Sequence, residues 1–127
     1  NEIKVWGLQL RFDFDTYEWN QCTDDFMFNI RAHEDINGLP GTVTSEALNV
    51  VAKKVPTGTL YAGIYEMYEW TIPFSATNIE HLSIQSASDG IDCWFLWMNS
   101  QEGDGFASSN SSNGWEEIEL DLSICIE

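Results

Sequence analysis

Basic residues are scarce in this sequence. Its 127 residues include five lysines and arginines against 21 aspartates and glutamates, so the formal net charge is −16 at pH 7. A surface this acidic repels phosphate backbones and anionic headgroups and attracts cations. We therefore expect no nucleic-acid partner. Long apolar runs are also missing, because none approaches the ~18 residues that a spanning helix requires. We expect no membrane span.

Cysteine is also scarce and odd in number. Cys22, Cys93 and Cys125 cannot all pair within one chain. No Cys-x-x-Cys or Cys/His cluster is present, so zinc and iron–sulfur sites have no support. We predict a disulfide between Cys93 and Cys125, because both fall in late predicted strands, and adjacent strands bring two Cα atoms to about 5.5 Å. Cys22 would then be the odd thiol.

The two histidines, His33 and His81, fall in predicted strands with no serine or cysteine motif such as Gly-x-Ser-x-Gly around them. We interpret both as hydrogen-bonded structural residues. Carboxylate pairs can serve as acid and base in a glycoside hydrolase, but spacing along the chain does not show which acids meet in the fold. We therefore expect a protein without catalysis, and a carboxylate-based glycoside hydrolase is the second alternative.

Apolar residues are abundant: 43% of the chain is hydrophobic and 13% aromatic, including six tryptophans. This composition indicates a folded chain, and the length indicates one domain over residues 1–127. Apolar and polar residues alternate in several short segments separated by turn signals, which predicts an all-β antiparallel β-sandwich. We predict strands over residues 3–14, 25–33, 65–74, 79–85, 92–99 and 117–126. Residues 45–55 fit a short helix as well as a strand, and residues 100–114 predict a loop.

Residues 88–99 are the segment around which we expect the fold to be organised, because they contain the densest aromatic block. Trp94 and Leu96 alternate with Phe95 and Trp97, so both faces of the strand are apolar. This pattern predicts a central strand covered on both sides. We expect four tryptophans to lie in the core: Trp6, Trp70, Trp94 and Trp97.

Three segments resemble the PLAT (lipoxygenase homology) family of β-sandwich domains. They are Thr23-Asp24-Asp25-Phe26-Met27-Phe28-Asn29-Ile30; Tyr61-Ala62-Gly63 with Trp70-Thr71-Ile72 and Ile79–Ile84; and Ser88-Asp89-Gly90-Ile91-Asp92-Cys93-Trp94-Phe95-Leu96. The sequence departs from the family at Asp13–Thr16, where a Thr-Gly-Asp turn is usual, and residues 45–55 have no counterpart. The resemblance implies a small binding or interaction domain that is often calcium-dependent and has no catalysis of its own.

Acidic residues cluster in predicted loops, often beside glycine. Calcium takes six to eight oxygen ligands from carboxylates and loop carbonyls, and glycine permits the sharp turns that such loops need. We therefore predict calcium as a cofactor, with these candidate ligands: Asp24, Asp25, Asp89, Asp92, Glu102 and Asp104. The alternative is that acidic loops only keep the protein soluble. We expect Asp89→Ala to cost binding more than folding.

Aromatic residues in loops suggest a carbohydrate partner, because flat rings stack on sugar faces and carboxylates accept hydrogen bonds from hydroxyls. The candidate ligand-binding residues are those in or near predicted loops: Tyr17, Trp19, Tyr61, Tyr65 and Trp115.

Several features favour a secreted, extracellular protein. Asn110-Ser111-Ser112 is a glycosylation sequon, and the chain begins at Asn1 rather than methionine, as a chain without its secretion signal would. We expect a glycan or another extracellular protein as the partner. The first alternative is a structural subunit of an extracellular filament or matrix that self-associates by strand pairing or disulfide linkage.

Overall fold

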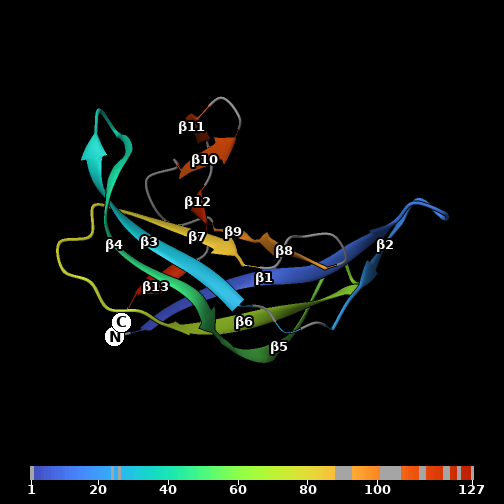
Figure 1. The fold of residues 1–127 in the computed structure, drawn as a ribbon. Coiled ribbons are helices and arrows are strands. Elements are labelled where there is room, and N and C mark those ends of the chain that lie inside the picture. Colours follow the sequence, from blue (N-terminus) through green and yellow to red (C-terminus); the bar gives the residue numbers. More distant parts are fainter. Residues whose placement is uncertain are drawn as a thin grey trace.

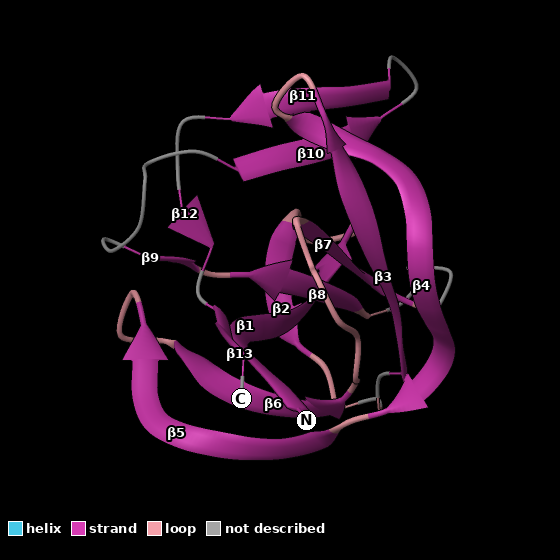
Figure 2. Cartoon of the chain, turned by 90° about the vertical axis from the view of Figure 1, so that its left-hand side faces the viewer, coloured by secondary structure: helices cyan, strands magenta, loops and turns pink. Residues whose placement is uncertain are grey.

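The computed structural model describes residues 2–23, 25, 27–87, 93–100, 107–111, 114–118, 121–122 and 124–126. Side chains are described for residues 2–23, 25, 27–87, 93–98 and 124–126. Every regular element in these residues is a β-strand, and every pairing is antiparallel (Figure 2). The two main sheets pack against each other, so the predicted all-β sandwich is confirmed. None of the described segments is a helix long and apolar enough to cross a membrane.

The first sheet is built on β1 (Glu2–Asp13), which pairs with four other strands along its length (Figure 1). Those strands are β2 (Glu18–Gln21), β6 (Tyr65–Pro73), β8 (Trp94–Trp97) and β13 (Ile124–Ile126), and β5 (Lys53–Tyr61) pairs with β6. β6 and then β2 follow one edge of β1, and β13 and then β8 follow the other.

The second sheet places β3 (Met27–Ile36) between β4 (Leu39–Val51) and β7 (His81–Ser86). Two short ladders lie outside the main sheets: β9 (Asn99–Ser100) with β12 (Asp121–Leu122), and β10 (Ala107–Ser111) with β11 (Gly114–Ile118). Residues 100–114, predicted as a loop, therefore include a strand.

The core lies between the two sheets and follows the predicted alternation on β3 and β6. Phe28, Ile30 and Ala32 on β3 are completely buried, as are Trp70 and Ile72 on β6. The Phe28 ring contacts Trp70 and the Phe95 ring of β8. Burying side chains of this size stabilises the fold by about 1.5–3 kcal/mol each before entropy is counted.

The predicted Cys93–Cys125 disulfide is wrong, because Cys22 pairs with Cys93 across a Cα–Cα distance of 5.9 Å. Cys125 is the free cysteine. It lies opposite Lys4, whereas Cys93 immediately precedes Trp94, which lies opposite Leu10. Six residues of extended strand separate these positions along β1, roughly 20 Å, which no disulfide can span.

Residues 45–55 are strand rather than helix. They belong to β4 and β5, and the side chains that would form the apolar helix face are exposed: Leu48 by 49%, Val51 by 71% and Val55 by 42%. Asn49 has a φ of 54°, and its N–H donates to the Asn29 side chain at 2.9 Å. This irregularity interrupts the β3–β4 register and accounts for the lack of strict alternation in the sequence.

Two further predictions are wrong in detail. Among the described residues β8 pairs with β1 alone, so it is an edge strand rather than a central one. Residues 117–126 contribute to three strands with three different partners rather than forming one long strand. Alternation shows which face a side chain occupies but not which neighbour a strand takes.

Candidate binding site on a projecting hairpin

β1 and β2 form a hairpin that extends away from the body of the sandwich (Figure 1). Phe12 lies directly opposite Trp19, and Asp13 opposite Glu18. The Asp13 carboxylate accepts hydrogen bonds from the N–H groups of Asp15 at 2.9 Å and Thr16 at 3.4 Å, an Asx turn that closes the hairpin. The strand β2 was not predicted, because a four-residue strand with four exposed side chains carries no apolar alternation.

Five aromatic rings line one face of this hairpin and the neighbouring β8. The Phe12 ring contacts three others, with centroid distances of 5.0 Å to Phe14, 6.2 Å to Tyr17 and 5.1 Å to Trp19. The Trp19 ring in turn lies 5.8 Å from Trp94. We name this group the aromatic strip: Phe12, Phe14, Tyr17, Trp19 and Trp94.

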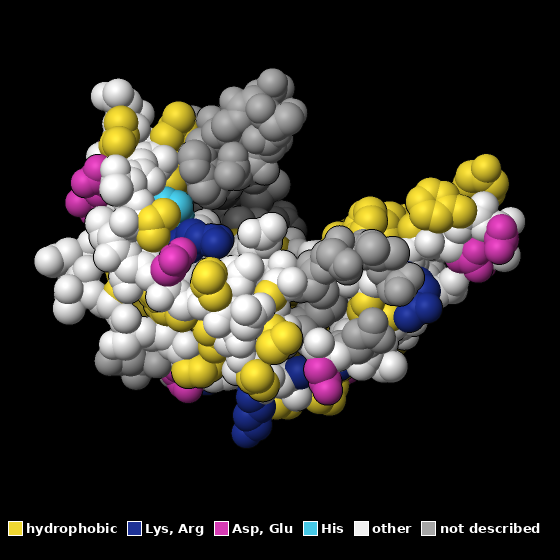
Figure 3. All heavy atoms as spheres, in the orientation of Figure 1, with side chains coloured by type: hydrophobic (Ala, Val, Ile, Leu, Met, Phe, Trp, Pro, Cys, Tyr) yellow, Lys and Arg dark blue, Asp and Glu magenta, His cyan; other side chains and the backbone are white. Residues whose placement is uncertain are grey.

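Four of the five rings of the aromatic strip are exposed. Phe14 is 75% exposed, Tyr17 78%, Trp19 38% and Trp94 42%, and Phe12 is half-buried in their midst. Figure 3 shows hydrophobic side chains along one side of the projecting hairpin. Large contiguous apolar patches on soluble proteins are often interaction sites, so the aromatic strip is the candidate site.

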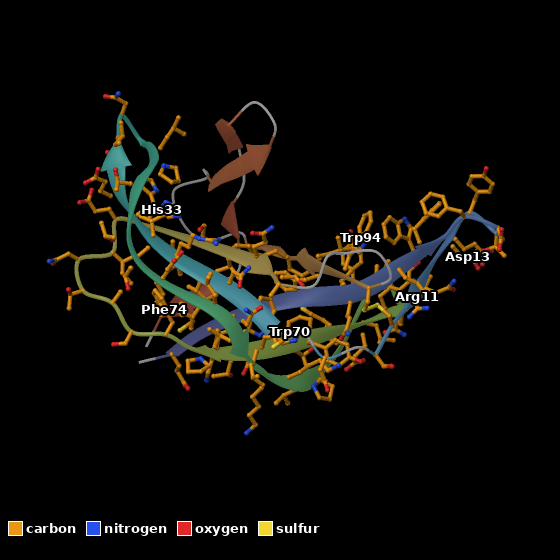
Figure 4. All side chains as sticks on the ribbon, in the orientation of Figure 1. Arg11, Asp13, His33, Trp70, Phe74 and Trp94 are labelled. Carbon is orange, nitrogen blue, oxygen red and sulfur yellow. A yellow bond between two sulfur atoms is a disulfide. The ribbon has the colours of Figure 1, made fainter. Side chains whose placement is uncertain are left out.

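The other face of the hairpin is charged. Side chains alternate along β1, so Arg11 and Asp13 point away from Phe12 and Phe14. Figure 4 places Trp94 and Arg11 on different sides of the β1 ribbon. Glu18 lies opposite Asp13, so two like charges face each other across the strands. Such a pair disfavours the hairpin, which makes the ring contacts on the other face more important for its stability.

The base of the hairpin is fixed to the sandwich by the disulfide and by a buried amide. Cys22 immediately follows β2, and Cys93 immediately precedes β8, so their bond joins the strands that carry Trp19 and Trp94. Gln9 is buried between these strands and donates from Nε2 to Cys93 Sγ at 3.3 Å. The side-chain oxygen of Gln9, Oε1, accepts a hydrogen bond from Lys54 Nζ at 3.0 Å. Gln9 is a polar residue between Leu8 and Leu10 in the sequence, yet it is almost completely buried.

Tyr17 is held in the left-handed region of backbone conformation, with a φ of 56°. This conformation costs a non-glycine residue roughly 1–2 kcal/mol. Such strain concentrates at functional positions, and here it presents the Tyr17 ring to the aromatic strip.

Tyr17→Gly is expected to leave the free energy of unfolding within about 1 kcal/mol of wild type, because relief of the backbone strain offsets the lost ring contact. Tyr17→Ala loses the same ring without that relief and should be less stable than Tyr17→Gly by roughly 1 kcal/mol. Urea unfolding of both variants checks this. Equal stability of the two variants would show that the turn is not strained at this residue.

The five predicted ligand-binding aromatics lie in three places. Tyr17 and Trp19 belong to the aromatic strip. Tyr65 lies beside it, since its hydroxyl donates to the Trp19 carbonyl at 3.3 Å. Tyr61 pairs with Tyr65 at the β5–β6 turn and is half-exposed. Trp115 belongs to β11, and its side chain lies outside the described residues.

Sequence reasoning missed Phe12, Phe14 and Trp94 as members of the site, and it placed Trp94 in the core. A signal was present for the first two. Phe12 and Phe14 are the last apolar residues of an alternating segment. The residues that alternate with them are charged: Arg11, Asp13 and Asp15. An apolar strand end flanked by acids is typical of a segment that extends beyond the core.

The predicted calcium ligands fall mostly on residues that the structure does not describe: Asp24, Asp89, Asp92, Glu102 and Asp104. Asp25 is described and exposed. Among the described side chains, no three His, Cys, Asp or Glu residues lie close enough to hold a metal ion. Calcium binding therefore stays a prediction. The sequon residue Asn110 lies on β10 opposite Trp115.

Both histidines form hydrogen bonds within the second sheet. Gly41 O can only accept, so His33 Nδ1 donates to it at 3.1 Å, and His33 Nε2 shares a hydrogen bond with the Ser83 hydroxyl at 2.8 Å. His81 Nε2 lies 2.6 Å from Asp35 Oδ1. The Glu80 carboxylate accepts from the Asp35 N–H at 2.9 Å. These contacts join the β3–β4 turn to β7.

The hydrogen bond from His81, followed by that from the Gly38 N–H, lowers the pKa of Asp35 below its ordinary value of 3.8. A depressed carboxyl pKa adds stability above pH 4, and this stability is lost as pH falls through the lowered pKa. We therefore expect wild type to be more stable than Asp35→Asn at pH 5 and the difference to shrink below pH 4. Urea unfolding from pH 5 to pH 2.5 measures it, and a constant difference would contradict the assignment.

No family model, curated protein or solved structure compared with the chain matches it.

Proposed function

We propose that this protein is a secreted, non-catalytic binding module that contacts a glycan through the aromatic strip. The observation that carries the proposal is the exposure of four aromatic rings. Three of them pack around Phe12 on a hairpin that stands clear of the sandwich core, and the fourth, Trp94, lies on the neighbouring β8. This role agrees with what the PLAT resemblance implies, a binding domain without catalysis.

The physical argument concerns the cost of exposing the strip. Each square ångström of apolar surface left in water forgoes about 25 cal/mol of burial free energy. Phe14 and Tyr17, each at least three-quarters exposed, gain little burial free energy from the fold. A ligand that covers these rings would recover that energy. Sugar rings fit, because one face carries C–H groups that cover an aromatic ring while the hydroxyls at the rim remain in water.

Electrostatics and rigidity also support a ligand of this kind. The hairpin is braced by a disulfide at its base and by ring contacts along its length. A rigid aromatic platform loses little conformational entropy when a ligand binds, which favours binding. The Asp15 carboxylate lies in the turn of the hairpin and can accept hydrogen bonds from sugar hydroxyls at the end of the strip.

The test is to titrate the protein with cellohexaose, chitohexaose and mannohexaose. Tryptophan fluorescence and calorimetry measure the binding. Trp19 and Trp94 are in the strip, so a bound sugar should change tryptophan emission. We expect Trp19→Ala to weaken binding by about tenfold or more, as loss of a central aromatic contact does. Leu60→Ala is the matched control, because Leu60 is 50% exposed on β5 and lies outside the strip.

Each titration is run with calcium and with EDTA, which tests the proposed cofactor at the same time. If binding is unchanged in EDTA, the strip binds its glycan without calcium. Failure of all three hexaoses under both conditions would show that the strip is not a glycan site. Sedimentation of the wild type and Trp19→Ala would then test the alternative of a self-associating structural subunit. If the strip joins copies of the chain, the wild type is an oligomer and Trp19→Ala dissociates.

A further inference from the structure

The rings of the aromatic strip do not share a plane. Phe12 is inclined by 76° to Phe14, by 72° to Tyr17 and by 67° to Trp19, and Trp19 is inclined by 67° to Trp94. Every one of these contacts is edge-to-face. A flat ligand surface stacks on several rings at once only when those rings are coplanar.

Edge-to-face contacts between neighbouring rings hold them at these inclinations. Phe12 and Trp19 are direct cross-strand partners. Trp94 lies opposite Leu10, which is two residues before Phe12 on the same face of β1. Edge-to-face ring pairs are worth about 0.5–1.5 kcal/mol each beyond their buried area. Turning the rings into one plane would break four such contacts, so a ligand must adapt to the strip as it stands.

Charge restricts the ligand further. Asp13 and Glu18 face each other on the reverse side of the hairpin, and Asp15 lies in its turn. Against these three acids, residues 10–21 contain one basic residue, Arg11. The whole chain carries a net charge of −16. A glycan bearing carboxylates or sulfates would meet repulsion both at the strip and at long range.

From these observations, and on the basis of the proposed function, we infer that the strip binds a single uncharged glycan chain that twists along its length. It does not bind the flat face of a crystalline polysaccharide or a polyanionic glycan. A twisted chain presents successive sugar faces at different angles, which matches successive rings that are steeply inclined to one another.

The experiment compares polymers that share a backbone and differ in order or in charge. Two pairs of insoluble polymers are compared: microcrystalline with acid-swollen cellulose, and crystalline with colloidal chitin. A sedimentation assay measures how much protein binds to each. Soluble probes are hydroxyethylcellulose, glycol chitin and galactomannan, which are uncharged, against carboxymethylcellulose, which is anionic, each in native affinity gels. Trp19→Ala and Leu60→Ala are run beside the wild type.

We expect binding to at least one disordered, uncharged polymer, at least tenfold weaker binding to its crystalline or anionic counterpart, and loss of binding in Trp19→Ala alone. Added salt should recover part of the binding to carboxymethylcellulose, because salt screens repulsion. Equal binding to crystalline and disordered forms, or to carboxymethylcellulose at low salt, would overturn the inference and leave the proposed function standing. Failure to bind any uncharged polymer would remove both.

Discussion

Replacing Cys22 and Cys93 together by alanine is expected to lower the free energy of unfolding by about 4 kcal/mol. The disulfide closes a loop of 71 residues, and the entropy that the unfolded chain gains when a loop of that size is opened gives this magnitude. Both sulfurs are also buried, at 4% exposure for each cysteine, so the truncation leaves small gaps beside Gln9. Because the bond joins β2 to β8, the variant should also lose the contact between Trp19 and Trp94.

Urea unfolding under oxidising conditions measures the loss, and near-ultraviolet circular dichroism reports the tryptophan pair. Cys125→Ala is the matched control, since Cys125 is free and should change stability by less than about 1 kcal/mol. A wild type whose unfolding is unchanged by reductant, or a Cys125→Ala variant as unstable as the double variant, would contradict the Cys22–Cys93 pairing.

Gly7→Ala is expected to cost about 1–3 kcal/mol, the range for a core that is overpacked. A Cβ atom on Gly7 would lie 2.6 Å from the Leu96 carbonyl oxygen and 2.6 Å from a Phe95 ring carbon. The carbonyl belongs to the backbone of β8, so relief requires β8 to move away from β1. Trp94 would move with β8, and binding at the aromatic strip should weaken although the substitution lies outside it.

Gly41→Ala serves as the control for this substitution. A Cβ atom there would meet the Ile36 side chain, which is 48% exposed, and would lie 3.2 Å from the Glu34 carbonyl oxygen, a milder backbone contact than the 2.6 Å at Gly7. We therefore expect Gly41→Ala to be the milder of the two in thermal unfolding. If Gly7→Ala were as stable as wild type, the close approach of β8 to β1 at this position would be wrong.

The sandwich could be predicted from the sequence because its core strands alternate cleanly. Phe28, Ile30 and Ala32 repeat with period two, and so do Trp70 and Ile72, since one face of each strand is buried and the other is not. Residues 45–55 could not be assigned, because β4 bends at Asn49 and leaves valines and a leucine in water. Composition alone does not report a local change of backbone conformation.

The site was predictable in part for a different reason. Tyr17 and Trp19 were identified because they follow the end of a strand, where a ring has no sheet to cover it. Trp94 was assigned to the core, because an aromatic block indicates burial, yet its strand lies at an edge in the part of the chain that the structure describes. The disulfide was mispaired because partner choice depends on where strands lie along β1. That position is a property of topology and not of spacing.

The antiparallel pairing of β1 with β13 has a practical consequence for how this domain can be handled. Ile3 lies opposite Ile126, so the two ends of the chain meet at one end of β1, and the hairpin that carries the aromatic strip lies at the other. A purification tag or a surface anchor attached at either end would therefore leave the rings unobstructed. A short linker could also join the two ends, with a new opening cut at the exposed turn around Gly38. Such a permuted chain would keep every strand of both sheets, and it offers a way to immobilise the domain with its hairpin pointing outward.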